Sequence, residues 1–543
     1  MVKINDKNGS TFHWWYTLNS QVVLILVFNI VLTCVTCAQV KHTAQQQWLV
    51  QGRRELRRAI RVTDKLNRNL ARNIILFIGD GMGISTVTAS RIRAGQLKGK
   101  NGEENLLFFE RFPNVGLVKT YSVDSQVTGS AAAGSAILTG VKINTGVLGC
   151  DSRVKKGNCT AFGPDTKLRT ILHAFMDEGL STGIVSNSRI THATPASAYA
   201  QTPHRGWEGD VDFPPNSNDC SHVKDIAKQL IFSNRDIKVI LGGGRRYFLD
   251  NSTNDPMLGV PDSHQRRDGL NLVEEWKQDK RQRNASHSYV WNKSGLDSVD
   301  TNTSEYLLGL FNPSHMDFDI QDPIEGVNRT EPTLVEMTQK AIEVLQKDTR
   351  GFFLMVEGAR IDFGHHANSA FTAITETIDL DLAVKTAVRM TNSRDTLIIV
   401  TADHSHAFAI QGYASRGHDI LGTADLGNDI VPLDGLPYTT LGYTNGPVFG
   451  REDLTNVNTG SPNFRQAGCI PLSIETHAGE DVGVYALGPM SHLFHATHEQ
   501  NYLYHVMEYA ACVGNSRRYC RNSKAHSRGP RRGNSVNISQ SEG

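Results

Sequence analysis

The sequence predicts an α/β protein: a three-layer α/β/α sandwich with a largely parallel central sheet and a surface insertion. Short apolar runs typical of buried strands recur along the chain. Helical patterns lie between them, which favours a parallel sheet flanked by helices. Several of the runs end in Asp, Glu or His, where open α/β sheets bind their ligands. The strands are expected at residues 74–78, 181–185, 238–241, 352–356, 396–400 and 482–487.

Composition indicates a globular protein without a strong electrostatic preference. The chain has 543 residues, enough for one large core or two ordinary ones. Its formal net charge is +1, and 20% of its residues are charged. Because no overall field favours nucleic acid or an acidic substrate, we expect no nucleic-acid partner.

Residues 1–38 have the pattern of a secretory signal peptide. An apolar run at residues 21–36 follows Lys3 and Lys7, and Thr36-Cys37-Ala38 offers small residues for cleavage after Ala38. An uncleaved anchor is the alternative, although the run is shorter than the ~20 residues that a spanning helix needs. We expect a secreted protein, with cell-surface attachment and membrane contact only if the anchor is retained. Seven Asn-x-Ser/Thr sequons support an exported glycoprotein: Asn158, Asn251, Asn284, Asn292, Asn302, Asn328 and Asn537.

Residues 39–70 are expected to form a basic N-terminal arm, with a helix at residues 48–70. Trp48, Leu49, Leu56 and Ile60 give this helix a partial apolar face. The pattern favours a solvated arm that docks by that face, and a membrane-surface role is the alternative. Its basic side chains are Arg53, Arg54, Arg57, Arg58, Arg61, Lys65 and Arg68.

The strand at residues 74–78 organises the rest of the chain. It ends at Gly79-Asp80-Gly81-Met82-Gly83, and a helix is expected at residues 84–94. The glycines allow backbone, and a metal or a phosphate, to approach closely. Asp80 is therefore either a helix cap or a ligand at the carboxyl edge of the sheet.

Ser130 precedes a short helix of small residues, expected at 131–138 and ended by Gly140. One interpretation makes Ser130 a helix N-cap. The other makes it a nucleophile whose reaction is helped by the positive end of the helix.

The later strands end in chemically similar groups. Asp362 and His366 lie four residues apart, which puts them on one face of a helical turn. Converging carboxylates and imidazoles would repel one another and be poorly solvated, so we expect divalent metals among them. The polar span 250–319 is expected to be the surface insertion. The candidate residues at or near strand ends are His192, Thr194, Arg205, Glu357, Asp362, His366, Asp403, His404 and His477.

Residues 73–520 resemble alkaline phosphatases of the animal type. The segments that carry the resemblance are 79–83, 356–358, 401–406 and 476–481. It implies one zinc ion held by Asp362, His366 and His477, a second held by Asp80, Asp403, His404 and the Ser130 oxygen, and a magnesium ion held by Asp80, Thr194 and Glu357. Arg205 would bind the phosphate through its guanidinium, and His192 would lie just beyond the magnesium ligands.

The resemblance also implies the reaction. Phosphate monoesters would be hydrolysed to an alcohol and inorganic phosphate through a phosphoserine on Ser130. The substrates would be small phosphate monoesters and the protein a homodimer. One alternative is a secreted metal-binding relative with weak or no activity that acts as a binding protein. Another is a sulfatase-like or diesterase enzyme on the same sheet.

Several positions depart from the family pattern. Gly129 replaces an aspartate that normally helps to hold the arginine, so we expect Arg205 to be looser here. Phe363 replaces the histidine that usually accompanies His192. A calcium site of the family matches here at Phe311 and Glu331 but not at two other acids, so we expect it to be degraded. Those two positions carry Asn312 and Met257.

The resemblance implies disulfides Cys159–Cys220 and Cys512–Cys520, which leaves Cys150 and Cys469 free to pair. The catalytic domain is expected at residues 71–512. Residues 513–543 are expected to form a disordered basic tail without a lipid-anchor signal.

Overall fold

The computed structural model describes residues 66–214, 220–319, 330–425, 432–518 and 520. The predicted signal peptide or anchor, most of the basic arm, and the sequons at Asn328 and Asn537 lie outside these residues. Residues 66–70, the described end of the predicted arm helix, are not helical. None of the helices within the described residues is long and apolar enough to cross a membrane.

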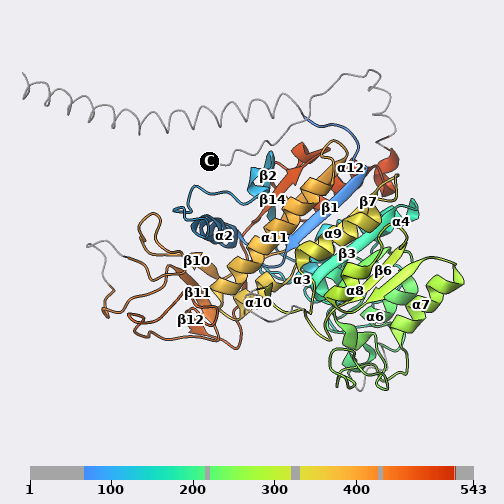
Figure 1. Ribbon diagram of the computed structural model, residues 1–543, viewed down its shortest axis with the longest axis horizontal. Helices are drawn as coiled ribbons and strands as arrows, with labels where there is room; N and C mark the ends of the chain where they lie inside the picture. The colour runs from blue at the N-terminus through green and yellow to red at the C-terminus, as the bar shows by residue number, and fades with distance from the viewer. Residues whose placement is uncertain (1–65, 215–219, 320–329, 426–431, 519, 521–543) are drawn as a thin grey trace, which may run out of the picture. The chain divides into compact units, whose positions relative to one another are not determined.

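A ten-stranded sheet lies at the centre of the described fold (Figure 1). Its strands are β1 (Asn73–Gly79), β2 (Asn114–Lys119), β3 (Ser181–Arg189), β4 (Val239–Gly243), β5 (His287–Val290), β6 (Tyr306–Leu310), β7 (Phe352–Gly358), β8 (Thr396–Ala402), β14 (Val482–Leu487) and β15 (Ala496–Glu499). Their order is β15-β2-β14-β8-β1-β7-β3-β4-β6-β5. β14 is antiparallel to β8 and β2, and the other pairings of this sheet are parallel.

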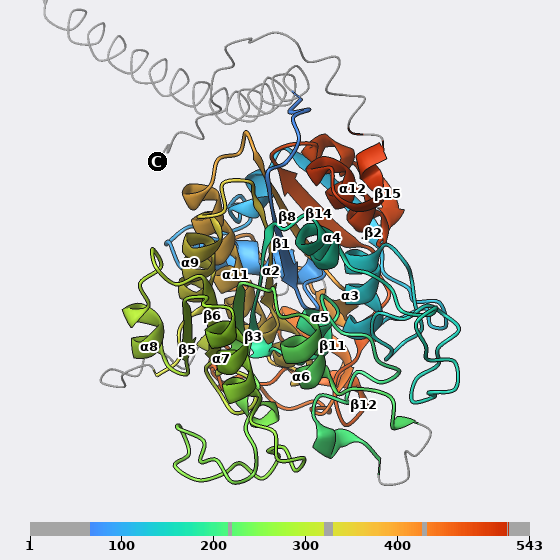
Figure 2. The same ribbon diagram turned by 90° about the vertical axis from the view of Figure 1, so that its right-hand side faces the viewer.

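Helices cover both faces of the sheet (Figure 2). On one face lie α2 (Ile84–Gln96), α9 (Leu334–Leu345) and α11 (Ala370–Met390). On the other lie α3 (Ser130–Thr139), α4 (Ile171–Asp177), α5 (Ala193–Ala196) and α12 (Tyr502–Ala511). Further helices complete the fold: α6 (Ile226–Lys228), α7 (Leu272–Gln282), α8 (Lys293–Ser298) and α10 (Arg360–His366). The predicted three-layer α/β/α sandwich is confirmed.

The central position of β1 explains why strand ends gather at one edge. All of Ile74 to Ile78 is fully buried, as expected for a strand covered on both faces. Gly79 pairs with Gly358 of β7 on one side and with Ala402 of β8 on the other. The residues that follow these three strands therefore emerge side by side.

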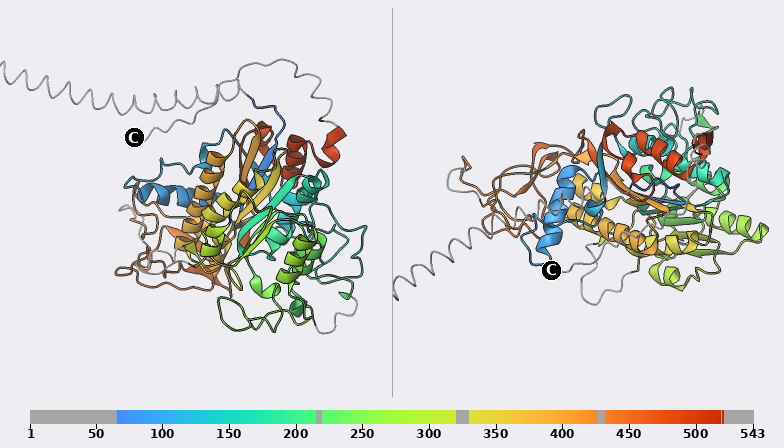
Figure 3. Two further views of the ribbon diagram at one scale, coloured as in Figure 1. Left: turned by 45° about the vertical axis from the view of Figure 1, so that its right-hand side comes forward. Right: turned by 90° about the horizontal axis from the view of Figure 1, so that it is seen from above.

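Two small sheets lie beyond the large one. β10 (Phe408–Ile410), β11 (Leu441–Gly446) and β12 (Gly468–Pro471) form a three-stranded sheet near one end of α11 (Figure 3). β9 (Ser405–His406) and β13 (His477–Ala478) form an antiparallel pair in which His477 lies opposite His406. This pairing brings His477 to the end of β8.

Two parts of the predicted organisation differ in the structure. The span 250–319 is not only surface insertion, because it supplies β5 and the fully buried β6 to the large sheet and also forms α7. The short run Tyr306–Leu310 escaped the prediction because polar, sequon-rich segments surround it. The start of the predicted tail is ordered: Gly514–Ser516 forms a short helix, and Arg517 pairs with Glu178. Residues 521–543 lie outside the description.

Candidate metal centre

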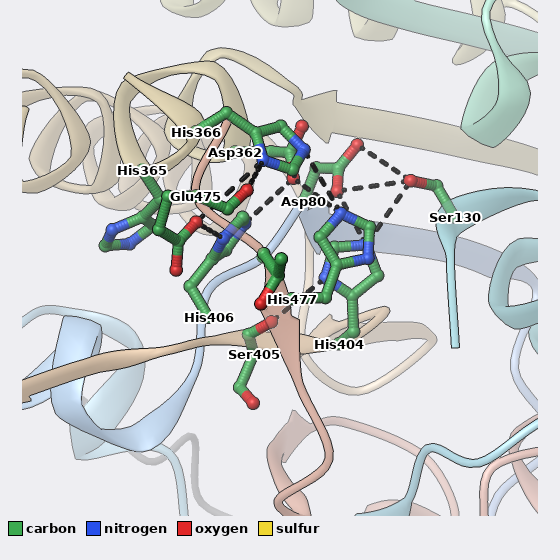
Figure 4. Close-up of polar contacts among 12 residues, drawn as sticks. Asp80, Ser130, Asp362, His365, His366, His404, Ser405, His406, Glu475 and His477 are labelled. Carbon is green, nitrogen blue, oxygen red and sulfur yellow. Dashed lines mark hydrogen bonds and ion pairs between the residues drawn. The ribbon is translucent and has the colours of Figure 1, made fainter. Parts of the chain in front are cut away.

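The predicted site residues meet at the carboxyl edge of the large sheet. Figure 4 shows Asp80, Ser130, Asp362, His366, His404 and His477 close together there. Asp80 follows β1, Glu357 lies near the end of β7, and Asp403 and His404 follow β8. Ser130 is the first residue of α3, where its hydroxyl faces the Asp80 carboxylate. Asp80, Glu357, Asp403 and His404 are fully buried, so their charges are shielded from bulk water.

Asp362, His366 and His477 form the first group. α10 presents Asp362 and His366 on one face, as their spacing predicted, with His366 Nε2 3.3 Å from Asp362 Oδ1. His477 Nε2 lies 3.3 Å from the same oxygen and 3.2 Å from His366 Nε2. Two unprotonated ring nitrogens so close together would repel each other unless a cation or a proton lay between them.

Asp80, Asp403, His404 and Ser130 form the second group. His404 Nε2 lies 3.4 Å from Asp80 Oδ1, 3.2 Å from Asp403 Oδ2 and 3.3 Å from Ser130 Oγ. Ser130 Oγ lies 3.4 Å from Asp80 Oδ2. The four predicted ligands therefore surround one common point.

Backbone carbonyls fix the ring orientation of all three histidines. Nδ1 of His366 donates to the Glu475 carbonyl at 2.6 Å and Nδ1 of His477 to the Thr128 carbonyl at 2.9 Å. Nδ1 of His404 faces the Ser405 carbonyl at 3.3 Å. A proton held on Nδ1 leaves the lone pair of Nε2 directed into the centre, the usual arrangement of metal-binding histidines.

A third group contains Asp80, Glu357 and Thr194. Ser186 and Ser188 donate to Glu357 Oε2 at 2.5 and 3.2 Å, which fixes that carboxylate. Its other oxygen, Oε1, and the Thr194 hydroxyl are buried without a hydrogen-bond partner among the described residues. Buried polar atoms are almost always paired, so these atoms fit a cation that the carboxylates hold.

The electrostatics indicate the same need for cations. Burial and the neighbouring carboxylates of Asp403, Asp362 and Glu357 raise the pKa of Asp80 well above its usual value. Burial likewise raises the pKa of Glu357 to about 7. Burial also opposes charge on Asp362, but the surrounding histidines hold its pKa well below the usual value. Divalent cations would stabilise all of these carboxylates in their charged form.

His406 and Glu475 form part of this centre that the sequence prediction missed. His406 Nε2 lies 2.8 Å from Asp362 Oδ1, and its Nδ1 lies 2.5 Å from Glu475 Oε2. Burial favours the neutral ring, yet these carboxylates raise the pKa of His406 to about 9. With both nitrogens donating, His406 orients Asp362 instead of binding a metal itself. The alternation of His404 and His406 along an extended segment was the signal that could have revealed it.

Arg205 lies beside Gly129, the residue that precedes Ser130. Its Nη2 donates to His192 Nε2 at 2.8 Å. A Cβ atom at Gly129 would lie 4.0 Å from Arg205 Nη1, so a longer side chain there would reach the guanidinium. Burial and Arg205 lower the pKa of His192 well below its usual value, so the ring is neutral. The centroid of the His192 ring lies 5.7 Å from that of Phe363 and 5.2 Å from that of His315.

The predicted cysteine pairs have different outcomes. Cys159 and Cys220 form a disulfide with a Cα–Cα distance of 5.4 Å, as predicted. The predicted bridge between Cys512 and Cys520 is not formed in this structure. The Cys520 thiol donates to the Ser516 carbonyl at 2.9 Å instead, and burial together with the neighbouring Cys512 thiol raises the pKa of Cys520 to about 12. Cys150 is buried and Cys469 is exposed, and the two do not pair.

The described sequons lie at the surface. Asn158, Asn251, Asn284 and Asn302 are exposed, and Asn292 is half-buried as the N-cap of α8. Their modification stays a prediction.

The residues at the expected calcium position form their own hydrogen bonds. Asn312 donates its amide to Glu331 Oε1 at 2.6 Å, and the Asp317 backbone donates to Glu331 Oε2 at 2.9 Å. Met257 is exposed and offers no carboxylate. These residues do not fit a full calcium site.

Comparison with known proteins identifies the family. Residues 71–513 match the family model described as alkaline phosphatase. The chain is 44% identical over 483 residues to the tissue-nonspecific alkaline phosphatase of Gallus gallus, covering 88% of this chain and 91% of that one. It is 43% identical over 459 residues to an alkaline phosphatase of Gadus morhua, covering 83% and 94%. The membrane-bound alkaline phosphatase of Bombyx mori is 42% identical over 464 residues, covering 83% and 82%.

Solved structures share the fold. Alkaline phosphatase from the Antarctic bacterium TAB5 has a TM-score of 0.56 at 23% identity, covering 82% of this chain and 100% of that one. The Thermus thermophilus enzyme has a TM-score of 0.58 at 23% identity, covering 82% and 92%. The chain therefore belongs to the alkaline phosphatase family and is an enzyme that hydrolyses phosphate monoesters with the help of metal ions.

Proposed function

We propose that this enzyme uses two zinc ions, one magnesium ion and a phosphoserine on Ser130. The observation that carries the proposal is the spacing of the ligand atoms. Ligands about 2.0–2.1 Å from a tetrahedral zinc ion lie about 3.3 Å from one another. The nearest distances within the first and second groups are 3.2–3.4 Å. Asp362, His366 and His477 would hold one zinc ion, and Asp80, Asp403, His404 and Ser130 the other.

Magnesium is proposed for the third group because its donors are oxygens. Glu357 and Thr194 supply oxygen atoms that have no hydrogen-bond partner among the described residues, and Asp80 would be shared with the second zinc ion. Carboxylate, hydroxyl and water are the ligands that magnesium prefers. Bound together, the three ions would lower the pKa of the Ser130 hydroxyl and neutralise charge that develops on the phosphate and the leaving group.

Ser130 is positioned for attack on phosphorus. It begins α3, so its oxygen lies at the positive end of that helix, and its backbone precedes the first free N–H groups. As its oxygen bonds to phosphorus, the bond from phosphorus to the alcohol oxygen would break. The Ser130 hydroxyl proton would pass to solvent, and the departing oxygen would take up a proton from solvent to give the alcohol. A water molecule would then attack the phosphoserine from the side that the alcohol vacated, releasing inorganic phosphate and restoring the serine.

Arg205 would hold the phosphate during both steps. Its planar guanidinium suits two phosphate oxygens at once. Gly129 leaves it without a carboxylate from that position, so we infer weaker phosphate binding than an aspartate would allow.

We also propose an exported homodimer. The Cys159–Cys220 disulfide favours an oxidising compartment, in agreement with the predicted signal peptide and sequons. Exposed apolar side chains lie on the edge strand β12 at Ile470 and just after it at Leu472 and Ile474, and a second copy of this chain would cover them. Sedimentation analysis of wild type and of Ile470→Lys tests the dimer, which should dissociate in the variant; unchanged mass would contradict this interface.

Turnover and trapping of the intermediate test the mechanism. Wild-type protein should hydrolyse a chromogenic phosphate monoester at alkaline pH and lose this activity in chelator. Ser130→Ala should lose at least about 10³-fold in kcat. Acid quenching during turnover should leave phosphate on the Ser130 peptide in mass spectra. Full activity of the alanine variant, or phosphate on another residue, would overturn the assignment.

A further inference from the structure

We propose that His192, and not a carboxylate, positions Arg205 for phosphate binding in this enzyme. The inference rests on the proposed role of Arg205. It assigns His192 a positioning role: the side chain acts through Arg205 and not on the substrate.

The contacts of Arg205 lead to this assignment. Its backbone N–H donates to the Gly146 carbonyl at 2.9 Å, which fixes the start of the side chain. Its guanidinium donates to His192 Nε2 at 2.8 Å. In the part of the chain that the structure describes, no carboxylate forms an ion pair with this guanidinium. A neutral imidazole therefore accepts the bond that orients the far end of Arg205.

Gly129 explains why an imidazole is needed. Its backbone is extended, with φ −126° and ψ 164°, so any residue could adopt it. A Cβ atom added at this position would lie 4.0 Å from Arg205 Nη1, so a side chain there could extend to the guanidinium. Glycine supplies no group in that direction, and within the described residues the guanidinium depends on His192.

Glu208 keeps His192 and Arg205 together. It lies three residues after Arg205 and accepts hydrogen bonds from Arg189 Nη2 at 2.7 Å and from Thr191 Oγ1 at 2.6 Å. Thr191 immediately precedes His192, and Arg189 ends β3. One buried carboxylate thus fastens the Arg205 loop to the segment that carries His192.

The same imidazole lies next to the third metal group. A ring nitrogen of His192 and carboxylate oxygens of Asp80 and Glu357 all lie within 4.8 Å of one another. A substitution of His192 could therefore also alter metal binding, so its effect on phosphate affinity has to be compared at equal metal content.

A double-mutant cycle tests the proposal. The dissociation constant of inorganic phosphate is measured by calorimetry on metal-loaded wild type, His192→Ala, Gly129→Asp and the double variant, each with its metal content determined. We expect His192→Ala to weaken binding about 10-fold in the wild-type background. In the Gly129→Asp background the loss should shrink to about 2-fold, because the new carboxylate also holds Arg205. His192→Gln, whose amide oxygen can accept the same bond, should retain affinity within about 3-fold.

The outcomes separate this inference from the proposed function. An equal loss in both backgrounds, or a loss that disappears at matched metal content, would overturn the positioning role. An unchanged dissociation constant of phosphate in His192→Ala would also overturn the positioning role. If the wild type still turns over a phosphate monoester, that result leaves the proposed function standing. If wild type binds no phosphate and turns over no monoester, both proposals fail together.

Discussion

At the scale of single residues, the affinity of each proposed metal ligand depends on the side chains that contact it. Asp362 contacts three imidazoles, and two of them belong to the proposed zinc site. The third, His406, is itself held by Glu475. Such outer contacts commonly change metal affinity by about 10–100-fold when they are lost.

Glu475→Gln should therefore weaken metal retention. The substitution keeps the size of the side chain but removes the charge that keeps His406 protonated toward Asp362. We expect zinc release to a chromogenic chelator to become about 10-fold faster. Asp381→Asn is a matched control, since Asp381 is a buried carboxylate on α11 that accepts from the Phe108 and Phe109 backbone, away from the metal ligands. Equal release rates in wild type and Glu475→Gln would show that the contact is dispensable.

Gly129→Asp should tighten inhibition by phosphate. An aspartate at this position can pair with Arg205 and hold it in the phosphate-binding orientation, so we expect the inhibition constant to fall about 5-fold. Gly129→Asn has nearly the same size without the charge and should have a smaller effect. Unchanged or weaker inhibition by Gly129→Asp would reject the idea that Arg205 is loosely held.

Sequence reasoning reached most of the proposed ligands because many of them follow recognisable strands. Asp80, Asp403 and His404 stand directly after apolar runs, so topology alone predicts that they meet. His406 was missed because it stands beyond the first two residues after β8, and Glu475 because it follows no strand of the large sheet. Their contact depends on the pairing of β9 with β13. Each of these strands has only two residues, which is too short for a recognisable sequence pattern.

At the scale of elements, the six expected strands formed because their runs are buried on both faces of the sheet. The helix begun by Ser130 also ends at Gly140 as expected, in the left-handed conformation with φ 77°. β5 and the small sheet of β10, β11 and β12 were not foreseen. β5 begins with His287 and Ser288 and is half-buried along most of its length, and β12 is a largely exposed four-residue strand that ends in Pro471, so neither has the pattern of a strand buried on both faces.

The N-terminus of α4 should make stability depend on pH. His173 accepts from the Thr170 backbone and contacts Asn234 at 3.0 Å, and burial lowers its pKa to about 4. The folded state thus binds fewer protons than the unfolded state between the unfolded pKa of 6.5 and 4. Its stabilising contribution is complete above pH 6.5 and is lost progressively as pH falls to 4, by up to about 3 kcal/mol.

His173→Gln removes this titration while keeping a side chain that can complete the capping box with Thr170. We expect the unfolding free energy of the variant to fall less steeply between pH 6.5 and 4 than that of the wild type. The difference in slope should correspond to the uptake of about one proton fewer on unfolding. Urea unfolding at several pH values provides the measurement. Parallel curves for the two proteins would contradict the assignment of this pKa to His173.

At the scale of the whole molecule, one disulfide and one cluster of buried carboxylates lead to testable predictions. The Cys159–Cys220 disulfide joins residues 61 positions apart. Replacing both cysteines by serine should lower the unfolding free energy by about 2–4 kcal/mol, because the unfolded chain gains freedom. Cys512→Ser is the control and should have a smaller effect, since that thiol is free. Thermal unfolding in non-reducing buffer compares them, and the opposite ranking would show that the second pair carries the structural bridge.

The four carboxylates Asp80, Glu357, Asp362 and Asp403 are buried together, and cations are the simplest means of keeping them charged. Elemental analysis of the purified enzyme, together with its turnover, tests this most directly. We predict two zinc ions and one magnesium ion per chain, with activity lost on chelation and restored when both metals are returned. Full turnover by protein that carries less than one metal ion per chain would contradict the account.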